Sequence, residues 1–157
     1  MIYKGERIMF ISAIEDVLKK LEAKFIMVLA TSSKDIVTAR NMSVITVNDK
    51  IYCQTDKNMT KTLQINENPH VAYCIDNIQI TGKAKVVGNS YENKRILAEY
   101  KKRHNSSYEK YKNVKDEVVI ETTIEKIQLW EYKDGKPYII KLNLVENTFE
   151  SKEYKIE

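Results

Sequence analysis

Two basic side chains and two hydroxyls gather around one predicted helix start and could together bind a phosphate. Lys57 and Thr60 lie on either side of Asn58, a residue type that commonly precedes the first turn of a helix, and Lys61 falls within that turn. Free N–H groups and the positive end of the helix dipole attract anions at such a position. Thr55, at the end of the preceding predicted strand, adds a second hydroxyl. A solvated helix start is the alternative, because Lys and Thr are also common surface residues.

Arg40 is a further charge that could reach the same anion. It lies in the middle of a predicted strand, which we expect to pair with the strand that ends at Thr55. An arginine in a sheet rich in Val, Ile and Thr needs either solvent or an anionic partner. The sequence pattern leaves both interpretations open: an anion ligand, or an outward-facing surface arginine.

Other kinds of chemistry have less support in the sequence. His70 and His104 have no neighbouring residues typical of a Ser-His-Asp arrangement, and the carboxylates are scattered. With only 4 Gly, the chain has neither a Walker-type loop nor a GxGxxG turn. Cys53 and Cys74 are too far apart in sequence for a CxxC motif, so we expect two packed thiols rather than a metal site or a disulfide.

Composition indicates one sheet-rich domain. The 157 residues are 43% hydrophobic and 31% charged, which argues against a disordered chain. There are 19 Ile and 12 Val against 8 Leu, and β-branched residues favour strands. The longest apolar run, Phe25 to Ala30, is far shorter than the roughly 20 residues of a membrane span. No signal segment is recognised at the start, so we expect a cytoplasmic protein that does not enter a membrane.

Hydrophobic periodicity and turn residues predict the elements that position the candidate side chains. Ser12 and Glu15 have the spacing of a capping box, and the apolar stripe after them predicts an amphipathic helix of about three turns. Further helices are predicted over Asn58–Asn66, with Asn58 as N-cap, and over Ser90–His104, followed by a loop or short helix to Lys115. Predicted strands cover Phe25–Ser32, Ile36–Val47, Lys50–Thr55, Val71–Ile75, Ile78–Val87, Val118–Tyr132 and Tyr138–Val145.

These elements predict a mainly β fold in a single domain over residues 1–157, with its core at about residues 12–145. The first three strands should form an antiparallel meander, and Gly82 should mark a bulge or a close backbone approach. The polar tail after Glu146 should fray. Six or seven antiparallel strands with peripheral helices must hide their edges, and closure into a small barrel is the simplest way.

The order of several short motifs resembles the FMN-binding split-barrel family related to pyridoxamine 5'-phosphate oxidase. The resemblance covers roughly Ser12 to Tyr132. It implies a six-stranded, Greek-key-like antiparallel split barrel and a homodimer with FMN in each of two clefts at the subunit interface. The motifs are Arg40-Asn41-Met42-Ser43-Val44, Tyr52 to Thr55, Lys61, Asn66-Glu67-Asn68-Pro69-His70-Val71 and Ile78-Gln79-Ile80-Thr81-Gly82-Lys83-Ala84.

The same resemblance implies roles for individual residues. Arg40 would anchor the flavin, with Asn41, Met42 and Ser43 at its ring edge. Gln54 and Thr55 match a pair that contacts the ribityl chain and phosphate. Thr60 and Lys61 match a phosphate-binding Arg-Lys pair of which only the lysine is present, and Lys57 could compensate. Trp130 resembles an aromatic that closes the cleft from the partner subunit, and a core tryptophan is the alternative.

One departure from the family bears on the reaction. In the true oxidase an arginine closely follows the tryptophan and binds the substrate phosphate, whereas no arginine occurs here after Arg103. The chain therefore looks closer to the small flavin reductases and nitroimidazole-resistance proteins. We expect an FMN-dependent oxidoreductase acting on a small flat molecule, with a nicotinamide as a candidate reductant. A non-catalytic flavin-binding or redox-sensing module is the alternative. An oligonucleotide-binding barrel is less favoured, because several tyrosines cluster in the predicted helical part from Tyr91 to Tyr111 rather than on strands, and no nucleic-acid partner is expected.

Overall fold

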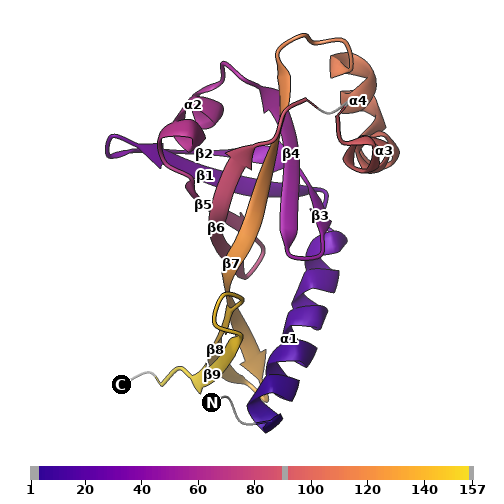
Figure 1. The fold of residues 1–157 in the computed structure, drawn as a ribbon. Coiled ribbons are helices and arrows are strands. Elements are labelled where there is room, and N and C mark those ends of the chain that lie inside the picture. The colour runs from indigo at the N-terminus through magenta and orange to yellow at the C-terminus, as the bar shows by residue number, and fades with distance from the viewer. Residues whose placement is uncertain (1–3, 90–91, 156–157) are drawn as a thin grey trace.

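The β-branched residues lie in a nine-stranded antiparallel sheet in the computed structural model, which describes residues 4–89 and 92–155 (Figure 1). The helices are α1 (Lys4–Glu22), α2 (Thr60–Glu67), α3 (Lys94–Arg103) and α4 (Asn105–Tyr111). The strands are β1 (Ile26–Ser33), β2 (Ile36–Ser43), β3 (Ile45–Val47), β4 (Lys50–Asp56), β5 (His70–Ile75), β6 (Ile78–Val86), β7 (Glu117–Lys133), β8 (Lys136–Asn143) and β9 (Thr148–Glu153). The predicted mainly β class is confirmed.

The sheet closes on itself because one stretch of chain changes its pairing partner. The strand order is β2-β1-β5-β6-β7-β4-β3, so β2 and β3, which are separated in sequence only by Val44, stand at its two ends. Val44 is fully buried, and its N–H donates to the carbonyl of Phe25 at 2.9 Å. The predicted single strand Ile36–Val47 is therefore wrong, and so is the simple meander. β2 pairs with β1, whereas β3 pairs with β4, and β4 continues onto β7.

A bulge in β6 is the predicted consequence of Gly82, and the structure confirms it. The register between β6 and β7 shifts between Thr81 and Gly82. A Cβ on Gly82 would lie 2.2 Å from the carbonyl oxygen of Thr123, so the two backbones approach too closely for any side chain. The bulge bends β6 where the sheet curves into the barrel.

Strand β7 extends well beyond the barrel, and β8 and β9 add to its far half (Figure 1). The prediction that the tail frays is wrong, because residues 148–153 pair with β8 and the ring of Phe149 packs against the core. Helix α1 covers this extension. It begins at Lys4 rather than after Ser12, and the buried ring of Phe10 is one reason that it continues upstream of the predicted capping box.

The remaining helices differ from prediction at their ends. Helix α2 has Met59, not Asn58, at its N-cap. Helix α3 begins at Lys94, after Asn93 accepts a hydrogen bond from the N–H of Ile96. The predicted start of that helix, Ser90, lies outside the described residues. The segment predicted as a loop or short helix contains α4. In the described part of the chain, no helix has the length and apolar character needed to cross a membrane.

Candidate functional site

A pocket of about 520 Å³ lies where β4 ends and α2 begins, between the strands of the barrel and the α3–α4 helices. Its lining residues are Asn41, Met42, Ser43, Gln54, Thr55, Asp56, Met59, Lys61, Tyr100, Ser107, Tyr111, Val114 and Glu117. Six of the predicted site residues are among them, namely Asn41, Met42, Ser43, Gln54, Thr55 and Lys61. The structure therefore brings together segments from β2, β4 and α2 that the sequence had suggested separately.

Arg40 is held by a polar network on the inner side of β1 and β2. Its guanidinium donates to the carbonyl of Leu29 at 3.1 Å, to the hydroxyl of Thr31 at 2.8 Å and to the hydroxyl of Thr38. Both threonine hydroxyls donate to Oε1 of Gln64 in α2, at 2.6 and 2.7 Å. Arg40 is thus not an outward-facing surface arginine. Its side chain is fixed beside α2, and it lies outside the set of residues that line the pocket.

Lys61 carries the second charge of the site. Burial lowers its pKa, and the nearby guanidinium of Arg40 lowers it further. Burial also lowers the pKa of Arg40. Within residues 4–89 and 92–155, neither cation forms a salt bridge with a carboxylate. The carboxylate of Asp56 acts on Lys61 without a salt bridge and offsets only part of the charge, so the two half-buried cations still give a local positive potential, which favours an anion.

Cys53 lies close to both cations but does not neutralise them. Its side chain is fully buried on β4, and burial raises the pKa of its thiol to about 12. The thiol is therefore neutral at physiological pH and does not offset the positive charge of Arg40 and Lys61. The expectation of two packed thiols holds for Cys53 but is wrong for Cys74, which is exposed on β5.

The first turn of α2 is anchored at Asp56, and the N–H of Thr62 donates to the carbonyl of Met59 at 2.9 Å. The hydroxyl of Thr62 donates to the carbonyl of Asp56 at 2.9 Å, and the carboxylate of Asp56 accepts from the N–H of Asn58 at 2.7 Å. The N–H groups of Thr60 and Lys61 belong to the first helical turn, where no carbonyl of the same helix can accept from them. The side chain of Thr60 is exposed and does not line the pocket.

Lys57 does not join the two cations at the pocket. Its ammonium lies 2.7 Å from the carboxylate of Asp116, and this hydrogen bond raises the pKa of Lys57 and lowers that of Asp116. The N–H of Lys57 also donates to the carbonyl of Asp116 at 2.9 Å. Lys57 therefore ties the segment before β7 to the segment before α2, and its charge has a partner.

The α3–α4 helices form the wall that sequence reasoning missed. The hydroxyl of Tyr100 lies 3.5 Å from the carbonyl of Ser43, and a ring nitrogen of His104 lies 3.0 Å from the carbonyl of Val44. Tyr100, Ser107 and Tyr111 then face the pocket. Positions 100, 104, 107 and 111 repeat at helical spacing, and this pattern could have identified the face in advance.

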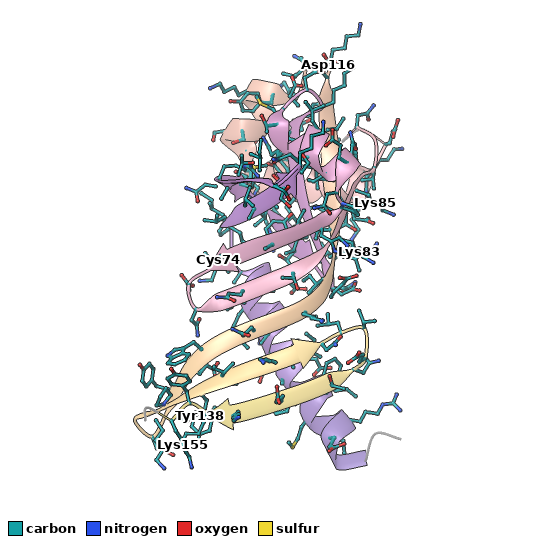
Figure 2. All side chains as sticks on the ribbon, turned by 90° about the vertical axis from the view of Figure 1, so that its left-hand side faces the viewer. Cys74, Lys83, Lys85, Asp116, Tyr138 and Lys155 are labelled. Atoms are coloured by element: carbon teal, nitrogen blue, oxygen red, sulfur yellow. The ribbon has the colours of Figure 1, made fainter. Side chains whose placement is uncertain are left out.

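Trp130 lies far from the pocket within one chain. Figure 2 shows Asp116, which directly precedes β7, at one end of the molecule and Tyr138, which pairs with Glu131, at the other. At about 3.3 Å per residue, β7 places Trp130 roughly 40 Å from Glu117. The side chain is 37% exposed, so it is not a core tryptophan. Its ring contacts Tyr132 and Tyr154, with centroids 6.3 and 5.2 Å apart.

The sequence profile of pyridoxamine 5'-phosphate oxidase matches residues 13–131, which span the barrel and the pocket. The chain belongs to this family. The general stress protein 26 of Bacillus anthracis is similar in structure, with 18% identity, a TM-score of 0.64, and coverage of 84% of this chain and 98% of that one. Among curated proteins, none matches the chain.

Two further solved structures share the fold, and their names mention flavins. One is a pyridoxamine 5'-phosphate oxidase-related, FMN binding protein of Nostoc punctiforme, at 11% identity and a TM-score of 0.61, covering 93% of this chain and 95% of that one. The other is a FAD-binding protein of Mesorhizobium loti, at 12% identity and a TM-score of 0.57, covering 74% and 90%. At these identities the similarity shows the fold.

Proposed function

We propose that this protein is an FMN-dependent oxidoreductase that acts on a small flat molecule. The observation that carries the proposal is the pair of cations, Arg40 and Lys61, which lies beside a family-typical pocket without a carboxylate partner in the described chain. A flavin mononucleotide has a phosphate that would neutralise this charge. Its remaining atoms suit a pocket of about 520 Å³, which is within the usual range for ligand sites.

Different residues would contact the phosphate, the ribityl chain and the ring of FMN. Lys61 and the free N–H groups of the first turn of α2 would hold the phosphate. Gln54 and Thr55 offer an amide and a hydroxyl to the ribityl chain. Asn41 and Ser43 offer polar groups to the edge of the ring. Bound FMN supplies hydride or electron transfer, and the chain's own contribution is to orient it and to place positive charge nearby.

Arg40 would act on the ligand through its charge and through the position of Lys61. Its guanidinium is already bonded to Leu29, Thr31 and Thr38, so it is oriented before any ligand arrives. Such preorganisation avoids the cost of ordering a long side chain on binding. Positive charge at this position also favours the negative charge that a flavin gains on reduction.

A homodimer is part of the proposal, because an apolar sheet face borders the pocket. Val28 is 38% exposed and pairs with Asn41 of the pocket on one side and with Cys74 on the other. In the next row, Ala30 pairs with Ala39 and with Ala72 on the same face. Small and apolar side chains on an open face are suited to packing against a second copy. A second copy is also the way in which Trp130 could reach a pocket.

The test is to look for bound flavin and then to remove its proposed phosphate ligands. We expect freshly purified protein, or protein supplied with FMN, to have the absorbance spectrum of a bound flavin. Arg40→Ala combined with Lys61→Ala should weaken FMN binding by at least tenfold, measured by fluorescence titration. Lys57→Ala is the matched control, since that lysine is already paired with Asp116.

Two results would contradict the proposal. Protein that is colourless and fails to bind added FMN has no flavin function. Unchanged FMN affinity in the Arg40 and Lys61 double variant would mean that the phosphate lies elsewhere. Oxidation of a nicotinamide by the loaded protein, followed by its absorbance, would separate an oxidoreductase from a protein that only binds flavin.

A further inference from the structure

The wall of the pocket opposite α2 contains one accessible aromatic ring. Figure 1 shows α2 and the α3–α4 helices on either side of β4, at the same end of the barrel. Two tyrosines of these helices line the pocket, and they differ in solvent exposure. Tyr100 is 4% exposed, and its hydroxyl is engaged by the carbonyl of Ser43. Tyr111 is 46% exposed at the end of α4. Its ring is therefore available to a ligand.

The position of Tyr111 is fixed from both sides of α4. Upstream, a ring nitrogen of His104 lies 3.0 Å from the carbonyl of Val44, and Arg103 donates to the carbonyl of Glu22. Downstream, Asp116 is bound by the side chain and the N–H of Lys57. A short helix anchored at both ends holds its last residue over the pocket, which is what a stacking contact requires.

Lys110 adds a charge beside this ring. Its ammonium lies 5.3 Å from the centroid of the Tyr111 ring, within the usual range of a cation–π contact. This contact occupies one face of the Tyr111 ring, so a flat ring system such as that of a flavin would stack on the other face. The phosphate end of the same ligand would lie at Lys61, on the other side of β4.

We propose that Tyr111 is a positioning residue for the flavin ring, supplied by the same chain that binds the phosphate. This inference rests on the proposed function. It assigns the two ends of the ligand to different walls, the phosphate to α2 and the ring to α4. The consequence is that the two walls contribute to affinity for different parts of the molecule.

Titration with FMN and with riboflavin, which lacks the phosphate, separates the two contributions. Tyr111→Ala should weaken the binding of both ligands by a similar factor, about tenfold, because stacking involves only the ring. Lys61→Ala should weaken FMN much more than riboflavin. Tyr111→Phe should bind both ligands like the parent protein. Tyr108→Ala is the matched control, since Tyr108 is on the same helix but outside the pocket lining.

The possible outcomes are distinguishable. Parent protein that binds neither ligand overturns the proposed function together with this inference. Parent protein that binds FMN, with Tyr111→Ala indistinguishable from Tyr108→Ala, overturns the role of Tyr111 alone. Circular dichroism melting checks that each variant is folded. If Tyr111→Ala does not fold, Tyr111→Leu replaces it: leucine keeps apolar bulk without a ring, and equal affinities of the Leu and Phe variants would overturn the inference.

Discussion

At the scale of single residues, the site depends on two positive charges whose proximity is unfavourable. Lys61 and Arg40 repel one another, and burial weakens their hydration. The fold tolerates this because the Arg40 guanidinium has three protein acceptors. A phosphate would relieve the repulsion, so ligand binding and stability should be linked.

The lowered pKa of Lys61 predicts how FMN affinity depends on pH. A phosphate stays doubly charged above about pH 7, so the charge of the phosphate itself does not change in the alkaline range. As pH rises through the pKa of Lys61, which is below the ordinary 10.5, the ammonium becomes neutral and FMN binding should weaken. Loss of one charge-assisted hydrogen bond, about 1.5–3 kcal/mol, corresponds to roughly 10- to 100-fold in Kd. Fluorescence titration across this range measures it.

Lys61→Arg is the control for this pH dependence. Arginine stays charged throughout the range, so the ratio of its FMN affinity to its riboflavin affinity should remain flat as pH rises. Riboflavin is the reference because it shares the imide N–H of the flavin ring, which titrates in alkali, but lacks the phosphate. An FMN-to-riboflavin affinity ratio of the parent protein that does not change up to pH 10.5 would contradict the assignment of Lys61 to the phosphate.

Sequence reasoning at this scale found residues that line the pocket better than it found their partners. Lys61 was singled out because a helix start attracts anions, and the Asn41–Ser43 segment was singled out by the family resemblance. Lys57 was placed with them because its partner, Asp116, is distant in sequence and invisible to a local pattern. Tyr111 was missed for the same reason, since only the docking of α3–α4 brings it to the pocket.

At the scale of elements, local signals predicted most strands but not their pairing. Asn48 and Asp134 stand between predicted strands, and both have positive φ in the structure. The switch at Val44 could not be predicted, because nothing local distinguishes a strand that continues from one that changes partner. Helix ends were the other weakness. The spacing of Ser12 and Glu15 does not mark a helix start, because α1 already begins at Lys4.

The bulge at Gly82 predicts a large effect of a small substitution. Gly82→Ala should lower the free energy of unfolding by at least about 2 kcal/mol, because the new Cβ would meet the backbone of Thr123 and the two strands would have to separate. Urea denaturation measures the change. Gly5→Ala is the comparison, since nothing lies within 4 Å of its Cβ position and its effect should be close to zero or slightly stabilising. Equal effects of the two would mean that the close approach is absent.

A cluster of charged side chains on three strands predicts how the free energy of unfolding depends on pH. Burial alone would raise the pKa of Glu121 on β7, but hydrogen bonds from Lys50 on β4 and Lys85 on β6 outweigh it and lower the pKa. Stability from Glu121 is therefore present above its unfolded pKa and is lost as pH falls through the lowered folded value. Glu121→Gln should destabilise the protein by about 1–2 kcal/mol near pH 7 and by much less in strong acid. Thermal unfolding at a series of pH values would show a constant difference if the cluster contributed nothing.

At the scale of the whole molecule, the distance between Trp130 and the pocket gives a direct test of the dimer. Trp130 is the one tryptophan of the chain, so fluorescence excited at the long-wavelength edge of the protein absorption band, where tyrosine does not absorb, would report on it alone. In a homodimer that brings Trp130 to the partner's flavin, FMN should quench this emission strongly. In a single chain, the long β7 keeps the two apart and quenching should be weak.

Val28→Lys is the variant that links this quenching to association. A charge on the apolar sheet face should convert the dimer to a monomer in light scattering and should abolish the quenching by FMN. Lys94→Glu, on an exposed position in the first turn of α3 and away from this sheet face, is the control for a change of charge. A parent protein that is monomeric at micromolar concentration would contradict the dimer.

The place of β7 between β6 and β4 also has a consequence for how the chain folds. Residues 117–123 pair with β4, which precedes them by some seventy positions, as in Ile51 with Thr122, and residues 120–129 pair with β6. Until β7 has been synthesised, β4 and β6 each have an open edge and the sheet cannot close. Such long-range pairing is slow, and open edges invite association with other chains. Synthesis of β7 therefore decides whether the earlier strands form a barrel or associate with other chains.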